Sequence, residues 1–106
     1  MKKAYVLTET TQANPLCEFT LGVVGFVFTS KKKANLQMDK IADLVTNGGW
    51  WSNVDGKPML GKVIRDVSGD YLGNILREML IETPNGLHEI WRMTEVELNL
   101  SYGFDE

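Results

Sequence analysis

The chain is poor in the residues that build covalent or metal-based cross-links. Among its 106 residues it has a single cysteine, Cys17, and a single histidine, His88. One cysteine excludes an intrachain disulfide, so a hydrophobic core must provide most of the stability. The two residues together are also too few for a zinc site of the Cys/His type. These shortages predict a protein of a reducing, cytoplasmic compartment that holds no metal.

Long hydrophobic runs are absent as well. The longest run, residues 21–28, is interrupted by Gly22 and Gly25 and is far shorter than the ~20 apolar residues that span a bilayer. The basic start of the chain is followed by an apolar run that stops after Leu7, whereas a secretory signal needs an apolar core of about 7–15 residues. The sequence therefore predicts neither a membrane span nor a secretion signal.

Basic side chains are scarce in the second half of the chain. Residues 1–65 carry nine basic and five acidic side chains, and residues 66–106 carry two basic and nine acidic ones, for a net charge of −3. This balance disfavours nucleic-acid binding, which depends on basic contacts to phosphates. It favours a protein partner with a basic surface. The composition, 43% hydrophobic, is that of one globular domain, which we place at residues 1–100, with residues 101–106 as a frayed tail.

The clearest element that the sequence predicts is an amphipathic helix over about residues 30–46. Thr29 or Ser30 can cap its start, because a hydroxyl oxygen accepts a hydrogen bond from a free amide of the first turn. Residues 47–49, Asn-Gly-Gly, can end it, because glycine adopts the left-handed conformation that is common just past a helix. An apolar stripe at helical spacing runs along one face: Ala34, Met38, Ile41, Ala42 and Val45.

Several other segments have the alternation or composition of strands. Residues 3–10 and 17–28 alternate in polarity, and the large apolar residues of the second run change parity around Gly25. One extra residue in a strand has this effect, so we predict a β-bulge near Gly25. Residues 62–67 and 87–100 are predicted as further strands.

Residues 71–83 fit two structures. Their apolar residues have helical spacing, but Gly73 and Asn74 are poor helix formers. The following residues 83–86, Thr-Pro-Asn-Gly, are typical of a tight turn. We therefore expect a β-hairpin between residues 75–83 and 87–98, with a helix as the alternative.

Together these elements predict an α+β fold. It is a single two-layer domain in which an antiparallel sheet of four or five strands carries the 30–46 helix on one face. The predicted core consists of Val6, Phe19, Leu21, Phe26, Phe28, Met38, Ile41, Val45, Ile75, Ile90, Val96 and Leu98.

Signatures of catalysis and of cofactor binding are incomplete. Residues 56–62 have the spacing of a phosphate-binding P-loop as far as its lysine, but Val63 stands where the motif has serine or threonine. His88 and Glu89 begin like the helix of a zinc protease, yet Arg92 replaces the second histidine. No serine lies in a nucleophile-elbow motif. We therefore expect no catalytic residues and no cofactor.

One candidate binding site lies at the start of the predicted helix. It consists of Thr29, Ser30, Lys31, Lys32 and Lys33. Free amides at a helix start, together with hydroxyl and ammonium groups, suit an anion such as a phosphate. The alternative is that the three lysines are simply solvated.

A second candidate site lies in the glycine-rich segment over residues 48–61. Trp50 and Trp51, with Asn53 and Asp55 close by, are candidate partner-binding residues. Tryptophan is a favoured anchor of protein interfaces. The alternative is that the tryptophans cover the open end of the core.

Residues 24–34, VGFVFTSKKKA, and residues 90–98, IWRMTEVEL, resemble a pattern found in small uncharacterised bacterial and phage proteins. In that pattern a first strand is followed by a second that ends in glycine and phenylalanine. Serine or threonine, charged residues and alanine come next, and then a helix. A strand like residues 90–98 closes the chain. The resemblance implies an arrangement of strands and helix, and an accessory protein of a phage or mobile element, but no activity.

The sequence thus leads to two hypotheses of function. The first is a non-enzymatic protein-interaction module, with self-association through a sheet edge as one form of it. The alternative is a binder of a small anionic ligand, a phosphate or a nucleotide, at the start of the 30–46 helix.

Overall fold

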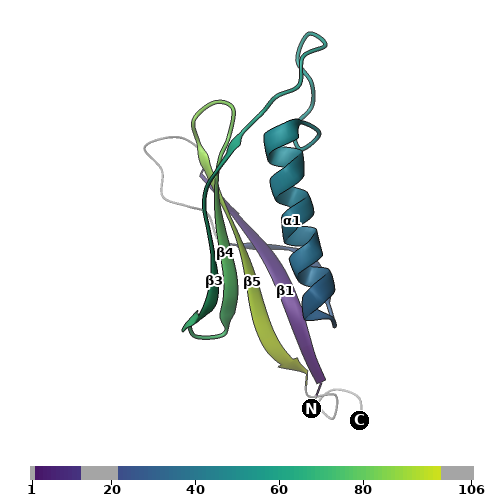
Figure 1. The fold of residues 1–106 in the computed structure, drawn as a ribbon, viewed down its shortest axis with the longest axis vertical. Helices are drawn as coiled ribbons and strands as arrows, with labels where there is room; N and C mark the ends of the chain where they lie inside the picture. Colours follow the sequence, from purple (N-terminus) through teal and green to yellow (C-terminus); the bar gives the residue numbers. More distant parts are fainter. Residues whose placement is uncertain (1, 13–21, 99–106) are drawn as a thin grey trace.

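A five-stranded antiparallel sheet carries one helix on one of its faces (Figure 1). The computed structural model describes residues 2–12 and 22–98. Within these residues the strand order is β2-β1-β5-β4-β3, and the helix connects the two edge strands. The predicted α+β fold is therefore confirmed. The elements are β1 (Lys2–Thr11), β2 (Val23–Phe28), α1 (Lys31–Asn47), β3 (Lys62–Leu72), β4 (Ile75–Glu82) and β5 (His88–Leu98).

Some predictions concern other parts of the chain. Cys17, Phe19, Leu21 and the predicted tail 101–106 lie outside the described residues.

α1 begins and ends where the sequence predicts. Ser30 is the N-cap, and its hydroxyl oxygen accepts a hydrogen bond from the Lys33 amide at 3.2 Å. Gly48 follows the last turn with a φ of 101°, and its amide donates to the carbonyl of Leu44 at 3.1 Å. The one helix in the described part of the chain lacks the length and apolar character needed to cross a membrane.

The predicted hairpin over residues 75–98 is confirmed. β4 pairs with β5 across residues 83–86, where the Gly86 amide donates to the Thr83 carbonyl at 3.0 Å. Gly73 and Asn74 form a second tight connection, between β3 and β4, which explains why they interrupt the helical pattern. β3 therefore extends to residue 72 rather than ending at the predicted residue 67, because its last residues pair with β4.

The predicted β-bulge at Gly25 is also confirmed. Leu7 pairs with Phe26 and Thr8 pairs with Val24, so Gly25 is an extra residue in β2. A Cβ atom at position 25 would lie 2.8 Å from the indole of Trp91. Glycine thus allows this indole to lie directly against the backbone of β2.

The core lies between α1 and one face of the sheet. Met38, Ile41 and Val45 are fully buried, as predicted, and Phe26 and Phe28 pack against this core while partly exposed. The buried residues that the sheet contributes are Leu7, Met79, Ile81, Trp91 and Met93.

The prediction for the sheet side of the core is wrong, because it chooses strand residues that face away from α1. Both faces of β1 and β5 carry apolar side chains, so alternation alone does not tell which face meets the helix. The strand register decides which face meets the helix, because it places Leu7 opposite Phe26 in β2 and opposite Met93 in β5. Five predicted core residues lie instead on the face opposite α1 and are only partly buried: Val6, Ile75, Ile90, Val96 and Leu98.

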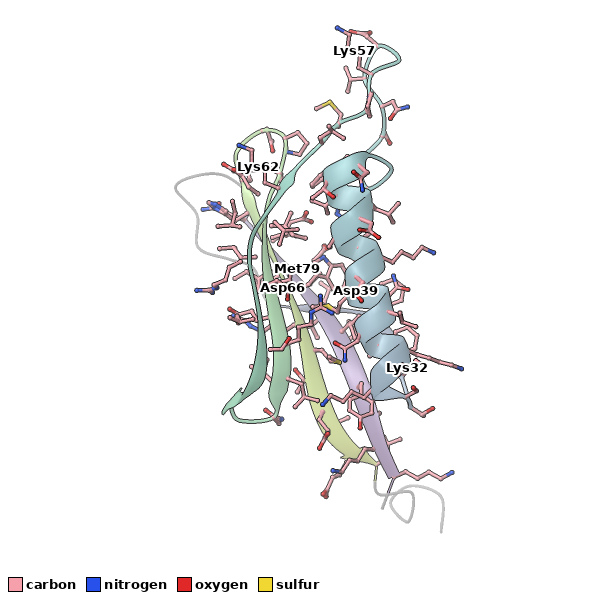
Figure 2. All side chains as sticks on the ribbon, viewed as in Figure 1. Lys32, Asp39, Lys57, Lys62, Asp66 and Met79 are labelled. Carbon is pink, nitrogen blue, oxygen red and sulfur yellow. The ribbon has the colours of Figure 1, made fainter. Side chains whose placement is uncertain are left out.

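A buried arginine joins α1 to the sheet. Arg77 of β4 is 8% exposed, and its Nε and Nη2 donate to the two carboxylate oxygens of Asp66 in β3 at 2.9 and 2.7 Å. Nη2 also donates to Asp39 in α1 at 2.8 Å, and Nη1 donates to the backbone and side-chain oxygens of Asn35. Asp39 and Asp66 are labelled in Figure 2 where the helix faces the sheet. The hydrogen bond to Asp66 is the main cause of a raised pKa of Arg77.

Candidate functional site

The tryptophan loop, which we define as residues 48–61, connects α1 to β3. It projects beyond the C-terminal end of α1 in Figure 1, and Lys57 lies near its tip in Figure 2. All four predicted partner-binding residues lie in it. The loop, the β4–β5 turn and the end of β1 together border one pocket, which makes this end of the molecule the first candidate site.

Trp50 covers the open end of the core. Its ring centroid lies 5.8 Å from that of the buried Trp91, with the ring planes at 73° to one another. The ring centroid of Trp91 in turn lies 6.0 Å from that of Phe26. Edge-to-face and tilted contacts at such distances stabilise aromatic clusters beyond the area that they bury. Trp50 therefore fixes the first arm of the tryptophan loop to the core.

Trp51 lies against Gly61 at the other end of the loop. A Cβ atom at position 61 would lie 2.6 Å from the Trp51 indole, so only glycine allows this approach. The Gly61 amide also donates to the carbonyl of Val45 in α1 at 2.8 Å. These contacts fix the second arm of the loop, while Trp51 itself stays partly exposed in the pocket wall.

Asn53 and Asp55 are exposed near the tip of the loop. Val54 and Lys57 exchange two backbone hydrogen bonds of 2.9 Å around Asp55 and Gly56. The φ angles of these two central residues are 51° and 74°, as in the type I′ turns that Asp-Gly favours. Asp55 thus has a structural role in the turn, and its side chain remains accessible.

The pocket at this end has a volume of about 450 Å³. Sites for small ligands span roughly 300–1,000 Å³, so it is large enough for a bound group. Its wall is mainly apolar and includes Trp51, Val54 and Met59 of the loop, Pro84 and Leu87 of the β4–β5 turn, and Glu89 of β5.

Glu89 brings a buried carboxyl group to the pocket. It is 8% exposed, and its Oε2 atom has no hydrogen-bond partner among the residues described. Burial raises the pKa of Glu89 to about 7, the carboxylate of Glu9 adds to the rise, and a hydrogen bond with Trp50 partly opposes it. Burial also raises the pKa of Glu9. Two neighbouring carboxyl groups of this kind are stabilised by a proton or by a cation beside them.

His88 belongs to the wall of the same pocket. Its carbonyl accepts a hydrogen bond from the Gln12 amide at 3.0 Å, and its own amide donates to Gln12 Oε1 at 3.3 Å. Its Nδ1 atom lies 3.4 Å from the same oxygen. These contacts join the end of β1 to the start of β5.

The incomplete motifs of the sequence do not assemble into sites. The P-loop-like residues 56–62 lead into β3, whereas a P-loop leads into a helix. His88 begins a strand, whereas the zinc-protease motif lies on a helix. Within residues 2–12 and 22–98 there is no group of three or more His, Cys, Asp or Glu side chains that could hold a metal ion.

Sequence reasoning did not identify Glu9 or Glu89 as site residues. Both lie at inward-facing strand positions, two residues from the buried Leu7 and Trp91 respectively. A charged residue among inward-facing apolar ones is an unusual signal. It becomes visible only once the inward parity of β1 and β5 is known.

The predicted anion-binding residues lie at the opposite end of α1. This helix has 17 residues, so its ends are about 25 Å apart at 1.5 Å per residue. Lys31, Lys32 and Lys33 are exposed, as is Thr29, and the hydroxyl of Ser30 caps the helix. A hollow of about 170 Å³ lies beside Lys31. In Figure 2, Lys32 lies far from Lys57, so the two candidate sites are separate.

Comparisons with protein-family models, with curated proteins and with solved structures found no match to this chain.

Proposed function

We propose that the protein is a non-enzymatic interaction module that binds another protein through the end of the fold formed by the tryptophan loop. The observation that supports this best is the apolar pocket with exposed apolar side chains around it. On the loop, Val54 is 53% exposed and Leu60 is 47% exposed. Exposed apolar side chains beside a concave, aromatic-lined site are typical of protein-binding surfaces.

The loop is also suited to present this surface without reorganising. Trp50 and Gly61 anchor its two arms, and the turn around Asp55 closes its tip. A surface that is ordered before binding loses less conformational entropy on association. The resemblance of residues 24–34 and 90–98 to small bacterial and phage proteins favours an accessory protein of a phage or mobile element, acting in the cytoplasm.

The test introduces a charge at the rim of the pocket. Val54→Lys should leave the melting temperature unchanged, because the side chain is exposed, and should weaken partner capture from a native cell extract by about tenfold or more, or ~1.4 kcal/mol. Leu36→Lys is the matched control, since Leu36 is a similarly exposed apolar residue, 57%, on α1. Equal capture by all three proteins would contradict the site. Capture no greater than that of an unrelated domain would contradict the function.

A second copy of the chain is one partner that this experiment can reveal. β2 is an edge strand, and in the described part of the chain no strand pairs with its outer side. Val23, Val24 and Val27 are exposed on it, and residues 22–29 carry no charge. Edge strands without charged residues tend to pair between chains.

The second candidate function is the binding of a phosphate or nucleotide by residues 29–33. Three adjacent exposed lysines and the hollow beside Lys31, which Asn35 and Ser68 also line, favour it. Three lysines at the positive end of the helix dipole destabilise the free helix, and the first turn of α1 has no acidic residue to compensate.

Replacing Lys31, Lys32 and Lys33 together by glutamate should stabilise the free protein by about 0.5–2 kcal/mol at low salt, because acidic side chains interact favourably with the dipole at a helix start. If the lysines bind an anion, the same variant should lose phosphate binding in a titration while its melting temperature rises. Unchanged phosphate binding would remove this candidate. A lower melting temperature would contradict the dipole argument itself.

A further inference from the structure

We infer that the pocket takes up a basic side chain, arginine or lysine, of the partner protein, and that Glu89 binds the charged end of that side chain. The inference deepens the proposed function and rests on it. It names the chemistry that the pocket recognises.

The first observation is the unsatisfied oxygen of Glu89. The residue lines the pocket and is more than nine-tenths buried, yet Oε2 has no hydrogen-bond partner in the described part of the chain. Buried polar atoms are nearly always hydrogen-bonded, and one without a donor is costly. A proton shared with Glu9 satisfies the pair while Glu89 is protonated. Once Glu89 is ionised, its oxygens can only accept, so a bound group must then supply the N–H or O–H.

The second observation is the lack of a counter-charge within the described residues. Glu9 lies beside Glu89, and neither takes part in an ion pair there. Glu78 on the opposite face shows the contrast, since Arg92 Nε and Arg65 Nη2 donate to its two oxygens at 2.7 and 2.8 Å. A cation from outside the fold would therefore complete the acidic pair.

The third observation is the wall of the pocket. Trp51, Val54 and Met59 offer apolar contacts, and arginine and lysine have apolar stems that pack on such surfaces. An indole also attracts a cation that lies over its face. Because the acidic residues of the described chain do not form a metal cluster, an organic cation fits better than a metal ion.

The test uses capped amino acids as probes, because the partner is unidentified. Nα-acetyl methylamides of arginine, lysine and citrulline are titrated into the ¹⁵N-labelled protein at pH 8, above the pKa of about 7 of Glu89. Arginine or lysine should produce saturable shifts at the Glu89 amide and the Trp51 indole. Citrulline, which has the shape of arginine without its charge, should bind at least about tenfold more weakly than arginine, a difference in binding free energy of ~1.4 kcal/mol or more.

Two variants assign the binding to the acidic pair. Glu89→Gln keeps the shape of the side chain and should abolish the shifts, and Glu9→Gln should weaken them. Glu97→Gln removes the same charge from the exposed far end of β5 and should bind like the wild type. Equal binding of citrulline and arginine, or unchanged binding by Glu89→Gln, would overturn the inference. Tighter binding of n-butylguanidinium than of capped arginine would assign the pocket to a free small molecule instead of a protein side chain.

The results also separate this inference from the proposed function. Partner capture that depends on Val54, together with no binding of the basic probes, would leave the interaction module standing and remove the basic side chain. Binding of the basic probes without any captured protein would show a cation pocket and contradict the interaction module.

Discussion

Replacing Arg77 by methionine should lower the free energy of unfolding by about 2–4 kcal/mol. Methionine keeps much of the apolar stem but leaves Asp66, Asp39 and Asn35 without their donor. Removing one partner of a fully buried ion pair costs about 3–5 kcal/mol. We expect less here, because the side chains of Asp39 and Asp66 are 58% and 32% exposed and water can partly replace the guanidinium.

Arg65→Met is the control for this change. Arg65 also donates to a carboxylate, that of Glu78, but its side chain is 55% exposed, so the loss should be about 0–1 kcal/mol. Urea denaturation of the two variants under identical conditions measures the difference. Equal losses would mean that Arg77 contributes no more than a surface ion pair, and that the apolar core alone holds α1 on the sheet.

The loss of Arg77 should also affect the candidate site. Its contacts tie α1 to β3, which are the two elements that the tryptophan loop connects. A shift of α1 relative to β3 would move the two arms of the loop, and with them Trp51 and the pocket. We therefore expect Arg77→Met to reduce partner capture as well, although the residue lies outside the pocket.

The parts of the fold that the sequence predicts correctly depend on local signals. The cap at Ser30, the glycine at position 48 and the apolar stripe between them define α1 within one segment. The bulge at Gly25 and the turn over residues 83–86 are likewise encoded by neighbouring residues. Local sequence preferences are enough where the structure depends on residues that are close in the chain.

The errors concern features that depend on pairing between distant strands. Val6 and Leu7 are both suitable core residues, and only the register with β2 and β5 turns Leu7 toward α1. The contacts of Arg77 join residues 11 and 38 positions apart, Asp66 and Asp39, and none of these positions is unusual by itself. Such partners become visible only when the sheet and helix are assembled.

In the candidate site, too, local sequence marks one part, and only the assembled fold reveals the other. The tryptophan pair marks its loop in the sequence, because two adjacent tryptophans in a glycine-rich segment are conspicuous. The pocket is not visible there, because residues 11–12, 51–59 and 83–89 must come together to form it. The acidic pair Glu9 and Glu89 is hidden for the same reason.

Glu89→Gln should make the free protein more stable at pH 8, by about 2–3 kcal/mol, and should not change its stability at pH 4. Burial raises the pKa of Glu89 from 4.5 to about 7. At pH 4, below both pKa values, the carboxyl group is mostly protonated in the folded and the unfolded chain alike. Between these two pKa values the unfolded chain releases the proton while the folded chain retains it, so stability falls as pH rises and levels off above about 7. Glutamine cannot ionise and avoids this loss.

The measurement compares the variant with the wild type by urea denaturation at pH 4 and pH 8. Differences between the two proteins are needed, because Glu78 has the opposite effect: hydrogen bonding to Arg92 lowers its pKa, so its contribution is lost as pH falls. Glu97→Gln should change stability little at either pH. A variant less stable than wild type at pH 8 would show that the carboxylate already has a favourable partner. A gain in stability combined with loss of arginine or lysine binding would instead show that Glu89 lowers the stability of the free protein and is kept for binding.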